Sequence, residues 1–220
     1  TDIWFAIVGL TGLTTLLFGA YIALFKHDLK GLLAYSTISH LGLITLLLGL
    51  DTELATVAAI LHIINHATFK ASLFMATGII DHETGTRDMR KLNGMWRFLP
   101  YTATLAMVAA ASMAGVPLLN GFLSKEMFFA ETLHQQVLGS MSWLIPVLAT
   151  IAGAFSVAYS ARFIHDVFFN GDPIDLPRTP HEPPRYMRVP IEILVVLCLL
   201  VGMFPHFIVG DMYQVVPGNF

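Results

Sequence analysis

Residues 99–134 read LPYTATLAMVAAASMAGVPLLNGFLSKEMFFAETLH, and the architecture of the chain follows from them. One straight helix of this length would measure about 54 Å, far more than the roughly 30 Å hydrocarbon core of a bilayer. Gly115, Pro117 and Gly121 lie near the middle and lower the cost of breaking the helix. We therefore predict two half-helices joined by irregular backbone, which a membrane tolerates only where it is buried in protein or lines a wet cavity.

The composition indicates that lipid surrounds much of the chain. Hydrophobic residues make up 55% of the 220 residues and charged residues only 12%, whereas a soluble domain carries about a quarter charged residues. The net charge of −3 gives no reason to expect a nucleic-acid partner. The single cysteine, Cys198, excludes an internal disulfide framework. Because Thr1 leads directly into an apolar run with no signal-peptide pattern, we expect the chain to be part of a longer protein.

Six apolar stretches are long enough to span the bilayer as helices. They lie at about 3–25, 31–50, 54–80, 99–134, 142–169 and 189–210. Period-two alternation is absent, and open sheet edges cannot be satisfied in lipid, so strands are a poor alternative. We predict an all-α polytopic membrane helix bundle with about six transmembrane helices, one of them discontinuous. The proline-rich segment 171–188 should be an extended loop.

Lys and Arg side chains fall almost entirely on one side of this six-helix arrangement. The loops on that side carry Lys26, Lys30, Arg87, Arg90, Lys91, Arg97, Arg178, Arg185 and Arg188. The opposite side receives Asp2, Asp51, Glu53 and Asp211 and no basic residue. By the positive-inside rule, the basic loops are predicted to be cytoplasmic in a cell membrane.

Two lysines, Lys70 and Lys125, remain inside the predicted spans. An ammonium group in hydrocarbon costs several kcal/mol, so such residues are seldom accidental. Snorkelling of the long side chain to the interface is the simpler alternative. A lysine can bind and release a proton, whereas an arginine stays charged. We therefore predict that both lysines belong to a pathway for protons or cations.

His62, His66 and Lys70 stand four residues apart and should lie along one face of a helix. Imidazole changes its charge near neutral pH, so this column is suited to passing protons in steps. The alternative is that the polar side chains only hold the bundle together by interhelical hydrogen bonds. A zinc site is a weaker interpretation, because Ile63 stands where a zincin has its glutamate and no third ligand is evident. We expect no metal and no cofactor.

Ser36, Ser39 and His40 share a face of the second span and favour a polar track through the bundle. Packing of small residues explains the serines almost as well. Lys30 lies at the cytoplasmic end of this span. A lysine there is explained either by the positive-inside rule or by a role at the start of the polar track. His40 and Lys30 complete the predicted proton-pathway residues.

Three segments carry a resemblance to a known family. They are DLKGLLAYSTISHLG at 28–42, the His62–Lys70 helix, and GVPLLNGFLSKE at 115–126. Together they resemble the antiporter-like, proton-translocating membrane subunits that Mrp-type cation/proton antiporters share with respiratory complex I. Leu118 departs from the pattern, because the family has a second proline there.

The resemblance implies two five-helix repeats of inverted topology, each with one broken helix. This chain would supply the second repeat at 1–170, then a cytoplasmic loop at 171–188 and a further helix with an external tail at 189–220. By resemblance, Lys125 is the buried lysine near the proton exit toward the outside. His62, His66 and Lys70 would form the central hydrated axis, and no redox cofactor is expected.

The segments PPRYMRVPIE at 183–192 and VGMFP at 201–205 resemble the large A subunit of the Mrp-type antiporter. This implies exchange of protons for a monovalent cation, with Na⁺ expected, in a complex with other membrane subunits. The alternatives are an antiporter-like subunit of complex I and a scaffold whose polar residues only pack. Two lysines at membrane depth argue against the scaffold.

Overall fold

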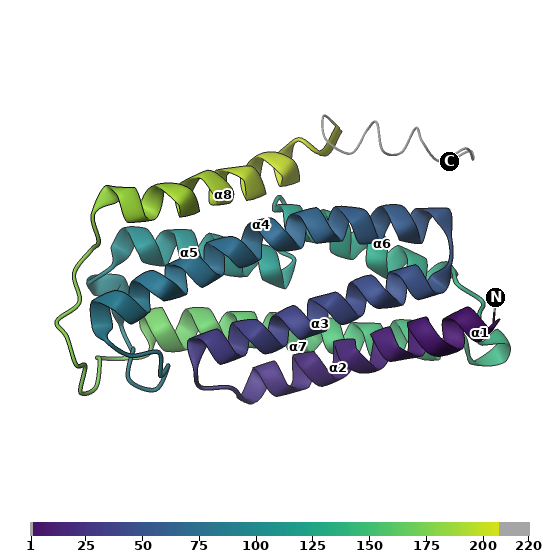
Figure 1. Ribbon diagram of the computed structural model, residues 1–220, viewed down its shortest axis with the longest axis horizontal. Helices are drawn as coiled ribbons and strands as arrows, with labels where there is room; N and C mark the ends of the chain where they lie inside the picture. The colour runs from purple at the N-terminus through teal and green to yellow at the C-terminus, as the bar shows by residue number, and fades with distance from the viewer. Residues whose placement is uncertain (1, 207–220) are drawn as a thin grey trace.

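The computed structural model describes residues 2–206, and apart from one isolated bridge between Asp28 and Asp88 its regular elements are helices. The helices run side by side along the long axis of the molecule (Figure 1). They are α1 Asp2–Trp4, α2 Leu10–Phe25, α3 Leu29–Leu50, α4 Glu53–Thr84, α5 Pro100–Ala114, α6 Asn120–His134, α7 Leu144–Ile164 and α8 Arg185–Met203. Short turns of π-helix extend α2 at Phe5–Gly9 and α7 at His165–Phe169, and 3₁₀ turns lie at Met95–Arg97 and Gly139–Met141.

Five helical segments within the described residues are long and apolar enough to cross a membrane. They are Phe5–Phe25, Leu29–Leu50, Glu53–Thr84, Gly139–Phe169 and Arg185–Met203. The remaining predicted span, 99–134, is divided into α5 and α6, whose 15 residues each are too few to cross alone. The predicted break in this span is confirmed.

Two predicted boundaries were wrong because an apolar run marks hydrocarbon and not the ends of a helix. The third span was predicted to end at residue 80, but α4 continues to Thr84 and stops at Gly85, whose φ of 75° ends the helix. The loop 171–188 was predicted to be extended to its end, but α8 begins at Arg185, directly after Pro184. The predicted span 189–210 and its tail continue into 207–220, which lie outside the described residues.

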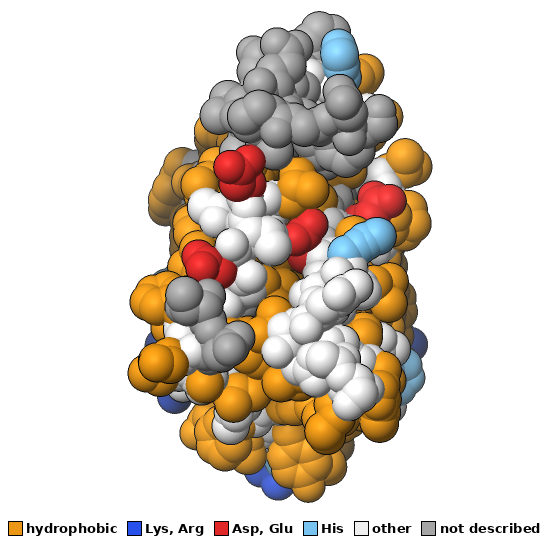
Figure 2. Space-filling model, turned by 90° about the vertical axis from the view of Figure 1, so that its right-hand side faces the viewer, with side chains coloured by type: hydrophobic (Ala, Val, Ile, Leu, Met, Phe, Trp, Pro, Cys, Tyr) orange, Lys and Arg blue, Asp and Glu red, His pale blue; other side chains and the backbone are white. Residues whose placement is uncertain are grey.

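The basic loops meet at one end of the bundle, on the left in Figure 1. The backbone N–H of Leu29 donates to Arg87 O, and that of Arg178 donates to Thr84 O. An ion pair joins Lys30 to Asp81 across 2.9 Å. Figure 2 looks onto the opposite end, where acidic side chains lie among hydrophobic ones. The two ends therefore differ in charge as the sequence predicts.

α5 lies among α4, α7 and α8 and has a buried face made largely of alanine. By contrast, α7 and α8 present apolar side chains on the outside of the bundle, among them Val147, Ile151, Val157, Ile193 and Val196. Such faces suit contact with lipid or with another membrane helix. The polar side chains of the candidate site lie inside the bundle instead.

Candidate functional site

The break between α5 and α6 has an unusual backbone. Gly115 has a φ of 90° and Leu118 a φ of 71°, both in the left-handed region. A proline ring fixes φ near −65°, so the proline that the family pattern has at position 118 could not take this conformation. Leucine at position 118 is therefore compatible with the local backbone, whereas proline is not.

Polar contacts hold the two sides of the break together. The Ser112 hydroxyl donates to Asn120 Oδ1 and accepts from the backbone N–H of Gly121 at 3.2 Å. The Asn65 amide of α4 donates to Asn120 O at 2.8 Å. These bonds replace the hydrogen bonds that the interrupted helix loses, and they tie α4, α5 and α6 at one point.

Substituting alanine for Gly121 should destabilise the break, because the added Cβ would lie 1.9 Å from Ser112 O. We expect a loss of about 1–3 kcal/mol of stability, as in an overpacked core. The measurement is the thermal unfolding midpoint of the purified complex. Gly78→Ala is the matched control, since nothing lies within 4 Å of its added Cβ. Equal midpoints for the two variants would contradict the close approach at Gly121.

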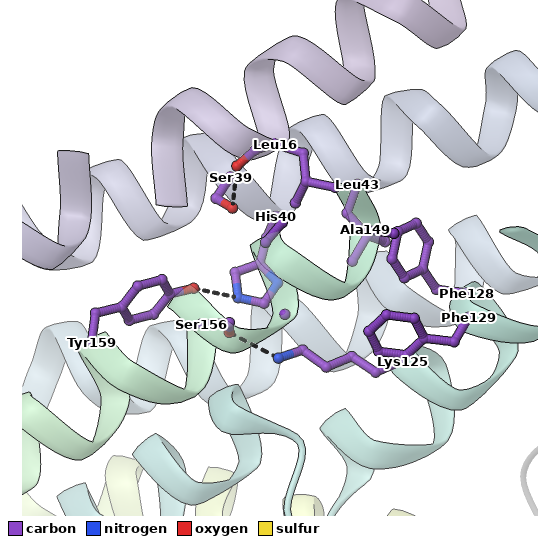
Figure 3. A pocket seen from close by; sticks show the side chains of 12 residues that line it. Leu16, Ser39, His40, Leu43, Lys125, Phe128, Phe129, Ala149, Ser156 and Tyr159 are labelled. Carbon is purple, nitrogen blue, oxygen red and sulfur yellow. Dashed lines mark hydrogen bonds between the residues drawn. The ribbon is translucent and has the colours of Figure 1, made fainter. Parts of the chain in front are cut away.

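Lys125 lies at the break with its side chain buried (Figure 3). Its ammonium donates to Met113 O at 2.7 Å, Ala114 O at 3.1 Å and Ser156 Oγ at 2.9 Å. The two carbonyls end α5, where unsatisfied C=O groups carry partial negative charge. In the described part of the chain no carboxylate is among its hydrogen-bond partners. The ammonium is thus stabilised by dipoles, so losing its proton would leave no buried anion unpaired.

His40 lies at the centre of a cluster of three histidines. Its Nδ1 lies 2.9 Å from His62 Nε2, and its ring stacks on both His62 and His66 with centroids 5.1 and 5.2 Å apart. His62 Nδ1 in turn lies 2.8 Å from Ser124 Oγ, beside Lys125 in α6. A chain of polar contacts therefore leads from α3 through α4 to α6.

A second connection runs from His40 to Lys125 along α7. The Tyr159 hydroxyl lies 3.4 Å from His40 Nε2, and Ser156, one turn away, accepts from the Lys125 ammonium. Figure 3 shows these side chains around a cavity of about 20 Å³. A space of this size is large enough for one water molecule, and most of its lining is apolar.

Lys70 is buried, and its ammonium contacts neighbouring helices. Its ammonium donates to Ser36 Oγ, to Leu33 O at 3.2 Å and to Met113 Sδ at 3.2 Å. In the described residues His66 Nε2 is buried without a partner. The i, i+4 spacing places the three residues on one face of α4, and the hydrogen-bond partners of the Lys70 ammonium lie on α3 and α5. The role of His62, His66 and Lys70 in proton transfer stays a prediction.

The remaining predicted residues lie on α3. Ser36 contacts Lys70, and Ser39 donates to Leu16 O at 2.9 Å. Lys30 lies at the end of the bundle with 39% of its side chain exposed, paired with Asp81. Lys30 stands one turn before Leu33, whose carbonyl accepts from the Lys70 ammonium. Lys30 thus belongs to the edge of the site.

Sequence analysis missed Ser124, Ser156 and Tyr159. A signal was present for two of them, because Ser156 and Tyr159 stand three residues apart within an apolar span. Ser124 was quoted only as part of a motif. Within residues 2–206, no group of three or more His, Cys, Asp or Glu side chains is arranged to hold a metal ion.

A helical bundle with a discontinuous helix and ionisable side chains at membrane depth has the features of a membrane transporter. The chain belongs to the family described as NADH:quinone oxidoreductase/Mrp antiporter, TM, whose model matches residues 1–156. The resemblance found in the sequence is confirmed.

Three similar proteins show which branch of the family this chain resembles. The probable A/B subunit of a K(+)/H(+) antiporter of Rhizobium meliloti (strain 1021) is 67% identical over 96% of this chain and 21% of its own length. The A subunit of the Na(+)/H(+) antiporter of Bacillus subtilis (strain 168) is 46% identical over 93% of this chain and 28% of its own. A chain in the structure of the Mrp complex from Dietzia sp. DQ12-45-1b has a TM-score of 0.83 and 40% identity, over 95% of this chain and 22% of that one. This chain therefore spans less than a third of each of these proteins.

Proposed function

We propose that this chain forms part of the large A subunit of an Mrp-type monovalent cation/proton antiporter and carries protons through its buried lysines and histidines. The observation that supports the proposal most directly is the Lys125 ammonium held by backbone carbonyls at the helix break. Lysine binds and releases a proton, and two polar connections join it to His40. The protein thus belongs to a secondary transporter and is not an enzyme.

The proposed pathway begins at the basic end of the bundle, with Lys30 and Asp81. Lys70 and Ser36 come next, followed by His66 and His40. From His40, protons reach Lys125 through His62 and Ser124 or through Tyr159 and Ser156. Where side chains are more than a hydrogen bond apart, water bridges them, as buried polar tracks allow.

The wider arrangement follows from the family. Residues 1–170 form one five-helix repeat of an inverted pair, and residues 171–184 connect this repeat to α8. The basic loops face the cytoplasm by the positive-inside rule. Other membrane subunits and lipid surround the chain. Because one relative is named for K⁺ and another for Na⁺, the exchanged cation is K⁺ or Na⁺.

The rival function is an antiporter-like subunit of respiratory complex I, since the family includes both branches. Transport by the full multisubunit complex separates the two. Everted membrane vesicles carrying it should lose an imposed proton gradient when K⁺ or Na⁺ is added, as followed with a pH-sensitive acridine dye. Failure of both cations to dissipate the gradient, with flavin and iron–sulfur proteins co-purifying, would overturn the antiporter proposal.

Replacing Tyr159 with phenylalanine should slow exchange without abolishing it, because the connection through His62 and Ser124 remains. We expect the exchange rate to fall about threefold to tenfold, which corresponds to the net free energy of one or two hydrogen bonds. The initial exchange rate in everted vesicles measures it. Tyr35→Phe, a hydroxyl removed outside the His40 contacts, is the control. An activity lost completely in Tyr159→Phe would contradict the existence of two connections.

A further inference from the structure

The strap, defined here as residues 171–184, contacts the first half-helix of the break from outside. The Glu182 carboxylate accepts from the backbone N–H groups of Tyr101 at 3.2 Å and Thr102 at 3.1 Å. It also accepts from the Thr102 hydroxyl at 2.7 Å. Leu99, at the N-cap position of α5, supplies no side-chain bond. Glu182 therefore caps α5, with a negative charge at the positive end of the helix.

The Glu182 contact helps to fix the axial position of α5, whose other end is tied to α6 through Ser112. Its buried face consists largely of Ala103, Ala106, Ala109 and Ala110. Small side chains allow helices to approach closely. The opposite end of α5 supplies the two carbonyls that hold Lys125. A shift of α5 along its axis would therefore change the distances at the ammonium.

A buried carboxylate holds the strap beside Glu182. Glu83, in the last turn of α4, is 4% exposed, and its Oε2 lies 2.8 Å from His181 Nδ1. Its Oε1 lies 3.0 Å from His82 Nδ1 on its own helix. The His181 contact therefore joins the strap to the end of α4.

The other charged groups around Glu83 have partners of their own. Arg178 of the strap donates to His82 O at 2.7 Å, and Asp81 of α4 pairs with Lys30 of α3. Glu182 lies 3.6 Å from Arg188 of α8. The first turn of α5, from Pro100, carries no charge. In the described residues, His181 is thus the strap residue whose side chain contacts Glu83.

We propose that Glu182 is a positioning residue for the Lys125 site and that the His181–Glu83 contact sets how firmly Glu182 is held. The strap fixes α5 at its N-terminus, and α5 presents its last carbonyls to the ammonium. The expected effect of Glu182 on transport rests on the proposed function of Lys125. The contact of Glu182 with α5 belongs to the fold, and it can be measured without a transport assay.

The first test weakens the cap in the full complex reconstituted in lipid nanodiscs, because Glu182→Gln removes the negative charge and one of the two acceptor oxygens. Hydrogen exchange of the peptide covering the start of α5 should rise about threefold to tenfold in Glu182→Gln, the effect of weakening a cap. The antiport rate in everted vesicles should fall in the same variant. Asp175→Asn, the same change of charge elsewhere in the strap, should alter neither. Unchanged hydrogen exchange in Glu182→Gln, or raised exchange with unchanged antiport, would overturn the positioning role.

The second test uses two replacements of His181. Hydrogen exchange at the start of α5 should be faster than in the wild type in His181→Ala, which loses the contact with Glu83. His181→Arg, which can keep an ion pair with the Glu83 carboxylate, should stay near the wild type. Exchange at the wild-type rate in His181→Ala would overturn the role of His181. If instead Lys125→Ala left antiport intact, the proposed function would fail while the exchange results still reported on the strap.

Discussion

Replacing Lys125 with alanine is expected to abolish cation/proton exchange by the assembled complex. The ammonium is the only basic group that touches the carbonyls of Met113 and Ala114 in the described residues. Both connections from His40 end at it or at its neighbour Ser124. A positioned proton-transfer group contributes on the order of a hundredfold or more, and we expect a loss of at least that size. The measurement is the initial exchange rate in everted vesicles.

Lys91→Ala is the matched control for that experiment. Lys91 is an exposed lysine in a loop at the basic end of the bundle, so the variant removes the same charge away from the site. Its exchange rate should stay near that of the wild type. Co-purification of the partner subunits must be equal in both variants. Full exchange in an assembled Lys125→Ala complex would remove Lys125 from the pathway.

The second large effect is expected at His40, and it distinguishes His40 from His66. His40 contacts His62 on one side and Tyr159 on the other, so His40→Leu interrupts both connections to Lys125. We expect a decrease of about a hundredfold in exchange. His66 stacks on His40 but makes no hydrogen bond through its buried Nε2 in the described structure. His66→Leu should therefore cost less, about tenfold or below.

The informative result is which of the two variants, His40→Leu or His66→Leu, has the lower exchange rate. A pathway that followed α4 alone, from His62 through His66 to Lys70, would make His66 at least as sensitive as His40. Rates are compared at matched expression in the same vesicle preparation. A greater loss in His66→Leu than in His40→Leu would contradict the pathway across helices that we propose.

The helix break could be predicted from sequence because its causes are local. Pro117 and the nearby glycines disfavour continuous helix, and the length of 99–134 exceeds what a bilayer requires. The left-handed conformation of Leu118 could not be predicted, because a non-glycine residue adopts it only where the surroundings enforce it. Burial of Lys70 and Lys125 followed from the rarity of charge in membrane spans, and both are buried.

The partners of these lysines lay beyond sequence analysis because they belong to other helices. Spacing within one helix placed His62, His66 and Lys70 on one face, but it carried no information about what α3 and α5 present to them. His40 and His62 stand 22 residues apart, and Tyr159 and His40 stand 119 apart. Only the packing of the bundle brings them together. The ends of α4 and α8 were missed because hydropathy reports lipid depth and not capping.

Exchange by a Lys125→Arg complex tests the central claim most directly. Arginine keeps a positive charge at the break and can reach the same carbonyls, but it does not release a proton at physiological pH. If Lys125 carries protons, the assembled Lys125→Arg complex should exchange no faster than Lys125→Ala. Exchange near the wild-type rate would mean that only the charge is needed, and the proton pathway proposed here would be wrong.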